Sequence, residues 1–105
     1  MSVIMTFRAA GDPDELERRA AQDPEAMRSI ADRAKEHGLI AHRFYGAEGK
    51  IMVVDEWPDA ESFQRFFEQM RPEIEPMMQA VGVTGEPEIT FWRKLDTHDE
   101  VGWEA

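Results

Sequence analysis

The feature that most constrains the fold is the run Lys50–Trp57, in which Ile51, Met52, Val53 and Val54 follow one another without a polar residue. Successive side chains of a strand point to opposite faces, so this run places large apolar groups on both of them. A strand with one face in water would instead alternate apolar and polar residues. The run is therefore predicted to be a central strand that is covered on both sides.

A helix follows this strand after a sharp corner. Pro58 has no backbone N–H and holds the residue before it in an extended conformation, so the strand is expected to end at Trp57. Asp59 is a favoured helix N-cap. Apolar residues then recur at helical spacing: Ala60, Phe63, Phe66, Phe67 and Met70.

The other elements follow in a simple order. Residues 2–8 are predicted to form a second strand that is mostly apolar on both faces and therefore central. Two helical segments come next, to about residue 22 and from residue 24 to 37, and each begins with an Asp-Pro pair. Residues 39–45 form a strand with the polar admixture of a sheet edge, and the glycine-containing residues 46–49 join it to the Lys50 strand as a hairpin. After the aromatic helix, whose apolar stripe continues past Pro72 and Pro76, residues 86–95 form the last strand.

This order predicts an α+β protein with the ferredoxin-like βαββαβ plan and a four-stranded antiparallel sheet. Helices can cover only one face of such a sheet, and a second copy that stacks sheet on sheet would cover the other. We therefore expect a homodimer, with a single domain in residues 1–95. The tail, residues 96–105, carries Val101 and Trp103 and is expected to pack on the partner subunit.

Composition excludes several classes of partner and chemistry. The chain has 105 residues, with 22 acidic and 12 basic ones, and the net charge of −10 would repel nucleic acids and anionic membranes. No cysteine is present, which excludes disulfides and thiolate chemistry. The N-terminus does not resemble a signal peptide, and no window is apolar enough to span a membrane, so a cytoplasmic location is expected.

The central stretch resembles a known superfamily. A buried strand that ends in Asp55-Glu56-Trp57, followed by Asp59, Glu61 and an aromatic helix, is similar to the dimeric α+β barrel proteins related to antibiotic-biosynthesis monooxygenases. The similarity covers roughly residues 40–70. It implies a homodimer with a pocket between sheet and helices that takes planar aromatic substrates or haem.

The aromatic residues are the first candidate site. An apolar or aromatic small molecule would suit a pocket lined by these side chains: Tyr45, Trp57, Phe63, Phe66, Phe67 and Trp92. The alternative is that all of them are core residues of a non-catalytic interaction or stress-type module without a pocket.

The resemblance also implies a second possible function, a monooxygenase-like reaction that needs no cofactor. Oxygenases of this type are described with an Asn, a Trp and a Tyr or Arg around the substrate, and haem-degrading relatives with Asn, Trp and His. This chain has no asparagine, and Phe66 stands nine residues after Trp57, where many relatives carry His. Only Trp57 carries over by position, so no cofactor is assigned.

A polar set is the second candidate site. His42 is a candidate general base that Asp55 or Glu56 would orient, and Arg93 lies on the last strand. Alternatively, His42 makes ordinary hydrogen bonds on an edge strand. The three histidines, at 37, 42 and 98, lack the spacing of a metal site, so no metal is expected. Nucleotide-binding loops and the serine-hydrolase elbow are absent from the sequence.

Overall fold

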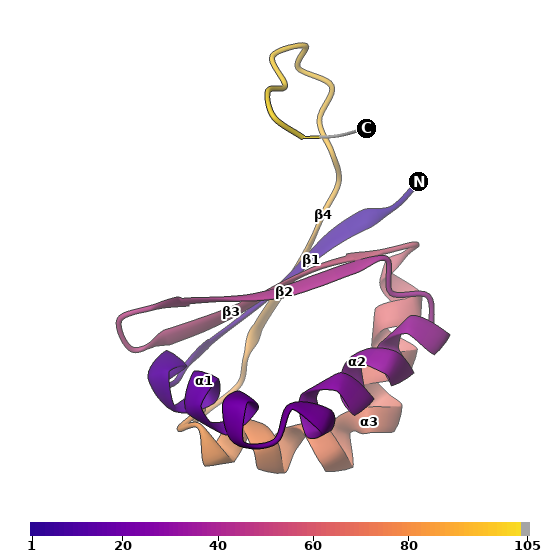
Figure 1. Cartoon of the computed structure of the whole chain (residues 1–105). Coiled ribbons are helices and arrows are strands. Elements are labelled where there is room, and N and C mark those ends of the chain that lie inside the picture. The colour runs from indigo at the N-terminus through magenta and orange to yellow at the C-terminus, as the bar shows by residue number, and fades with distance from the viewer. Residues whose placement is uncertain (104–105) are drawn as a thin grey trace.

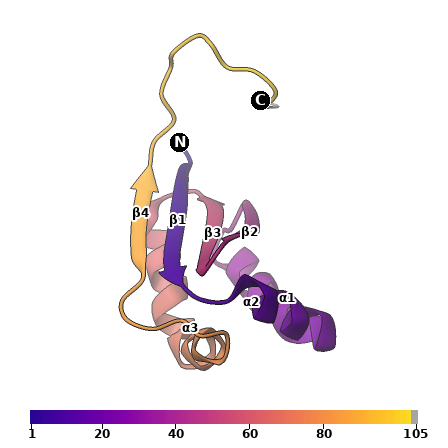
Figure 2. The ribbon, with the colours of Figure 1, turned by 90° about the vertical axis from the view of Figure 1, so that its left-hand side faces the viewer.

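The computed structural model describes residues 1–103 and contains one sheet with three helices on one of its faces (Figures 1 and 2). The elements in order are β1 (Val3–Ala10), α1 (Pro13–Gln22), α2 (Pro24–Glu36), β2 (Ala41–Ala47), β3 (Lys50–Trp57), α3 (Ala60–Ala80) and β4 (Glu88–Trp92). The strands lie in the order β2-β3-β1-β4, and all neighbours are antiparallel. The predicted ferredoxin-like fold is confirmed, with β1 and β3 as the central strands.

The element boundaries differ from the sequence prediction at several places, beginning with β1, which continues to Ala10 rather than ending at residue 8. Leu39 is not in β2, because its backbone N–H donates to the carbonyl of Ala34 and closes the end of α2. The β2–β3 hairpin turns in two residues rather than four, because Ala47 is paired with Lys50. β4 is shorter than predicted, ending at Trp92 rather than at residue 95.

Helix α3 is continuous through Pro72 and Pro76 but changes direction along its length (Figures 1 and 2). A proline inside a helix removes one backbone hydrogen bond and crowds the preceding turn, which bends the helix. Both prolines are exposed, so the carbonyl groups left without a helical partner face water. The bend turns the second part of α3 across the end of the sheet and toward α2.

The core lies between the sheet and the helices. Met5 and Phe7 of β1 pack with Trp57 of β3 against α3, which contributes a buried stripe with Phe63, Phe66, Met70, Ile74 and Met78. A smaller cluster joins Leu16 of α1 to Ile51 of β3 and Val81. Each central strand thus buries the alternate residues that the sequence pattern predicts on its helix-facing side.

Among residues 1–103, no helix covers the other face of the sheet, which we call the open face. It carries the side chains that alternate with the core positions: Ile4, Thr6, Arg8, Arg43, Tyr45, Lys50, Met52, Val54, Glu56, Glu88, Thr90 and Trp92. Trp92 is 52% exposed, and its indole N–H donates to Thr6 Oγ1 at 2.9 Å. The charged residues of this face are three basic and two acidic ones, although the chain as a whole is strongly acidic.

The C-terminal tail extends beyond β4, away from the helices (Figure 1). Val101 and Trp103 are 86% and 77% exposed, so neither side chain packs against the rest of the described chain. The last part of the predicted tail, residues 104–105, lies outside the described residues. Within the described chain, no helix is long and apolar enough to cross a membrane.

Asp59 caps α3 and makes the stability of this helix dependent on pH. The backbone N–H of Ser62 donates to Oδ1 of Asp59 at 2.8 Å, and the hydrogen bonds from the Ser62 backbone and then its side chain lower the pKa of Asp59. A pKa lowered by folding adds stability above the unfolded pKa, and this stability is lost as the pH falls through the folded pKa.

We predict that Asp59→Asn, which keeps an acceptor oxygen but no charge, lowers the melting temperature at neutral pH by a few degrees. The difference from the wild type should shrink as the pH falls from about 7 to about 3, because the wild-type carboxylate becomes protonated. Thermal unfolding followed by circular dichroism at several pH values measures this. A difference that stays constant over the range would contradict the assignment of the pH effect to Asp59.

Candidate functional site

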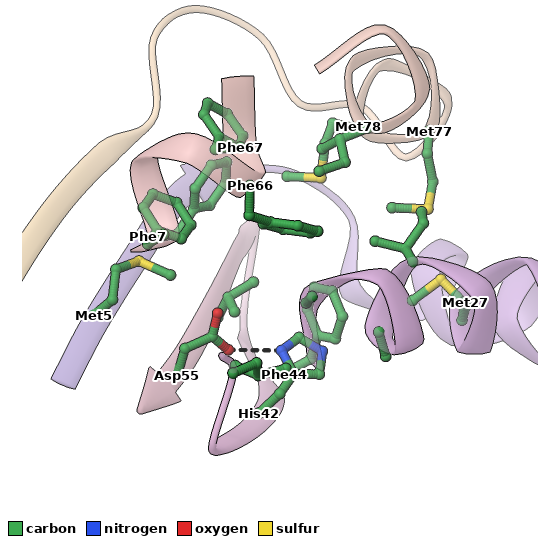
Figure 3. A pocket seen from close by; sticks show the side chains of 17 residues that line it. Met5, Phe7, Met27, His42, Phe44, Asp55, Phe66, Phe67, Met77 and Met78 are labelled. Carbon is green, nitrogen blue, oxygen red and sulfur yellow. Dashed lines mark hydrogen bonds and ion pairs between the residues drawn. The ribbon is translucent and has the colours of Figure 1, made fainter. Parts of the chain in front are cut away.

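A pocket lies between the sheet and helices α2 and α3 (Figure 3). Seventeen residues line it, and all except His42 and Asp55 are apolar or aromatic. Its cavity of about 90 Å³ is smaller than the several hundred Å³ that larger ligands occupy, but far larger than the space of one water. In this conformation the cavity has no room for haem or a fused-ring substrate.

The bend in α3 shapes this pocket. Phe63, Phe66 and Phe67 come from the first part of the helix, whereas Met77 and Met78 come from the part beyond the prolines. In Figure 3, Phe67 and Met77 lie well apart, and Met78 lies between them. Helix α2 closes the third side with a stripe of small and flexible residues: Met27, Ile30, Ala31 and Ala34. Methionine side chains are unbranched and adaptable, so the walls can adjust to a guest.

The polar part of the pocket is a pair of side chains from neighbouring strands. The register pairs His42 of β2 with Asp55 of β3, and both side chains turn toward the helices. His42 Nδ1 lies 2.7 Å from Oδ1 of Asp55, as the dashed line in Figure 3 marks. The indole N–H of Trp57 donates to the other oxygen, Oδ2, at 3.1 Å. Both oxygens of a carboxylate that is only 6% exposed are therefore hydrogen-bonded.

Trp57 lies behind the pocket rather than in its wall. It is fully buried, and its ring centroid is 5.7 Å from that of Phe63 and 5.6 Å from that of Phe66. Of the six aromatic residues predicted to form a pocket, Phe63, Phe66 and Phe67 line it. Trp57 packs against Phe63 and Phe66 on the side away from the cavity, and its indole N–H holds Asp55 in place.

The structure does not bring the other predicted residues to this pocket. Tyr45 and Trp92 lie on the open face, because they pair with Met52 and Ile4, whose side chains point away from the helices. Glu56 also faces that side and accepts a hydrogen bond from Ser2. Arg93 follows the end of β4, is exposed, and does not line the cavity. Of the polar candidates, only His42 and Asp55 meet.

Several pocket residues were not assigned to a site by the sequence. Met27 and Ala31 were predicted only as residues of the second helical segment, and Phe44 only as a strand residue. The apolar stripe beyond the prolines was the one available signal, because a bent helix can bring Met77 and Met78 over the sheet. Within residues 1–103, no group of three potential ligands forms a metal site.

We predict that Trp57→Ala lowers the free energy of unfolding by about 3–5 kcal/mol, because it empties the centre of the core. Trp57→Phe should cost about 1–3 kcal/mol, since it removes the indole N–H from a buried carboxylate. Chemical denaturation measures both values. Gln64→Phe, which introduces the same side chain at an exposed position of α3, is the control and should shift stability by less than about 0.5 kcal/mol. Equal effects of the two Phe substitutions would contradict the role of the Trp57 hydrogen bond.

Comparison with known proteins identifies the fold. No protein-family model and no curated protein matches the sequence. Solved structures do match, among them a conserved protein from Methanosarcina mazei Go1, with 17% identity over 90% of this chain and 94% of that one and a TM-score of 0.64. SnoaB, a cofactor-independent oxygenase from Streptomyces nogalater, matches with 19% identity over 94% and 98% of the two chains and a TM-score of 0.60.

A dimeric ferredoxin-like protein from an uncultured marine organism is also similar, with 16% identity over 95% of this chain and 93% of that one and a TM-score of 0.62. Identities this low show a common fold and nothing finer. The chain therefore has the same ferredoxin-like fold as the antibiotic biosynthesis monooxygenase-like proteins, as the sequence resemblance implied.

Proposed function

We propose that this chain, which has the ferredoxin-like fold of the antibiotic biosynthesis monooxygenase-like proteins, binds a small, largely apolar or aromatic molecule in the pocket between α2, α3 and the sheet. The observation that carries the proposal is the cavity itself, which is apolar except for the His42–Asp55 pair. A well-packed core leaves few voids larger than a water molecule, whereas a binding pocket combines apolar walls with a few polar groups.

The size of the cavity limits the ligand. A cavity of about 150 Å³ holds benzene, and the 90 Å³ found here is smaller. A single aromatic ring therefore enters only if the flexible methionines move aside. The ligand class is a one-ring aromatic or an aliphatic molecule of similar size.

The reaction class that fits the fold is oxygenation without a cofactor, because SnoaB, a structural neighbour, is described as a cofactor-independent oxygenase. The residues favour binding over that chemistry. Trp57, the one residue that the oxygenase motifs share with this chain, is fully buried behind the cavity and does not line it. We therefore propose ligand binding as the function. If the protein binds no small molecule, the alternative of an interaction module without a ligand is favoured.

We also propose that two copies pair through their open faces. Ile4, Met52 and Val54 lie on this face without helices above them. Its nearly balanced charges would let two copies of an acidic chain approach each other there, while repulsion acts elsewhere. The neighbour described as a dimeric ferredoxin-like protein supports dimer formation by this fold. The exposed Val101 and Trp103 of the tail would then pack on the partner subunit.

We predict that toluene binds the protein with a Kd of about 1 mM or tighter, equivalent to about −4 kcal/mol. Ala31→Phe should weaken this binding at least tenfold, because the added ring fills the cavity from α2. Ala26→Phe introduces the same side chain on the exposed side of α2 and should leave binding unchanged. Ligand-observed NMR measures the affinities. Equal toluene binding by both variants, or no binding by the wild type, would overturn the pocket proposal.

We predict that Ile4→Glu dissociates the dimer. The new carboxylate would lie beside Glu56, which pairs with position 4, in a surface that the dimer buries, and this should cost about 3 kcal/mol or more, a hundredfold or greater increase in the dissociation constant. Gln64→Glu adds the same charged side chain on the exposed surface of α3 and should leave the dimer intact. Sedimentation equilibrium measures both. A monomeric wild type at micromolar concentration would refute the pairing.

A further inference from the structure

The carboxylate of Asp55 is an exception in its surroundings. The other helix-facing residues of β3 are Ile51, Val53 and Trp57, whose side chains are apolar or mostly apolar. Burial of an ionised carboxylate is costly even when it is hydrogen-bonded, and an apolar side chain of similar size would often be as stable. Stability alone therefore does not account for an acid at this position. Its hydrogen bond to His42 suggests that it acts on that ring.

The pairing decides which nitrogen of His42 is available. An ionised carboxylate can only accept hydrogen bonds. Nδ1 of His42 therefore carries the hydrogen and donates a hydrogen bond to Asp55. Nε2, on the far side of the ring, then has a free lone pair. Within residues 1–103, no protein group hydrogen-bonds to Nε2. The His42 side chain is 31% exposed and lines the cavity, so a bound molecule can reach it.

The groups around His42 leave Asp55 as its sole charged neighbour in the pocket. Phe44 of β2 meets the imidazole edge to face, with ring centroids 5.1 Å apart. The residues that α2, α3 and β1 contribute to the pocket lining are all apolar. A positive charge formed on His42 would therefore be stabilised by one carboxylate at 2.7 Å.

We infer that the His42–Asp55 pair is a proton-accepting site, and that the pocket binds small phenols. This inference rests on the proposed binding function. In the step, the O–H bond of the ligand breaks and an N–H bond forms at Nε2 of His42. The electron pair of the O–H bond stays on oxygen, which becomes a phenolate beside the imidazolium. No electron is transferred and no co-reactant is needed. Asp55 is a positioning residue, since it orients the ring and stabilises its positive form.

The test uses 4-nitrophenol, a one-ring phenol whose anion is yellow, at a pH below the pKa of the free phenol. Binding to the wild type should produce the absorption band of the anion, because His42 takes the proton. His42→Gln keeps an N–H donor for Asp55 but cannot accept a proton. It should bind 4-nitrophenol more weakly than the wild type and, at saturating ligand, produce no anion band. Circular dichroism checks that the variant is folded.

The same measurements with 4-nitroanisole, which has no acidic proton, separate this inference from the binding function. If the wild type binds 4-nitroanisole and 4-nitrophenol without an anion band, proton acceptance is refuted while the pocket stands. If neither compound binds, both the inference and the proposed function are overturned. An anion band that persists in His42→Gln would also overturn the assignment to His42.

Discussion

The hydrogen bonds of the buried Asp55 carboxylate hold the site together. One oxygen accepts from the indole of Trp57 and the other meets the imidazole of His42, so a single side chain joins the core to the edge of the pocket. Trp57 in turn lies under Phe63 and Phe66 of α3. Because an unpaired buried carboxylate is costly, the two partners and the acid form one unit, and the loss of either would disturb the others. The position of His42 therefore depends on a tryptophan that never touches the cavity.

A second constraint comes from the sheet. Both central strands carry apolar residues on both faces, and three helices cover only one of them. On the helix side, the bend of α3 at its prolines leaves a cavity instead of a closed core. On the open side, Tyr45 and Trp92 lie among Ile4, Met52 and Val54. The two faces thus have separate proposed roles, one for a ligand and one for a second copy of the chain.

The sequence predicts the fold well because the fold depends on local signals. The Asp-Pro pairs, the Trp57-Pro58 corner and the doubly apolar strands each specify an element or its position without knowledge of its partners. The site was harder to predict, because the register of neighbouring strands decides which side chains face the pocket. Tyr45 and Trp92 were grouped with the phenylalanines by type, although the pairing of their strands turns them to the opposite face. His42 and Asp55 were both identified, but the alternative partner Glu56 could be rejected only once the register of β2 against β3 was known.

The most direct test of a ligand pocket beside His42 is a crystal structure of the protein soaked with 4-bromophenol, located by the anomalous scattering of bromine. The proposed pocket predicts a bromine peak in the cavity between α2, α3 and the sheet, with the ligand hydroxyl within hydrogen-bonding distance of His42 Nε2. It also predicts that the side chains of Met77 and Met78 shift to admit the ring. A bromine peak only on the open face, or a cavity that stays closed at saturating ligand, would contradict it.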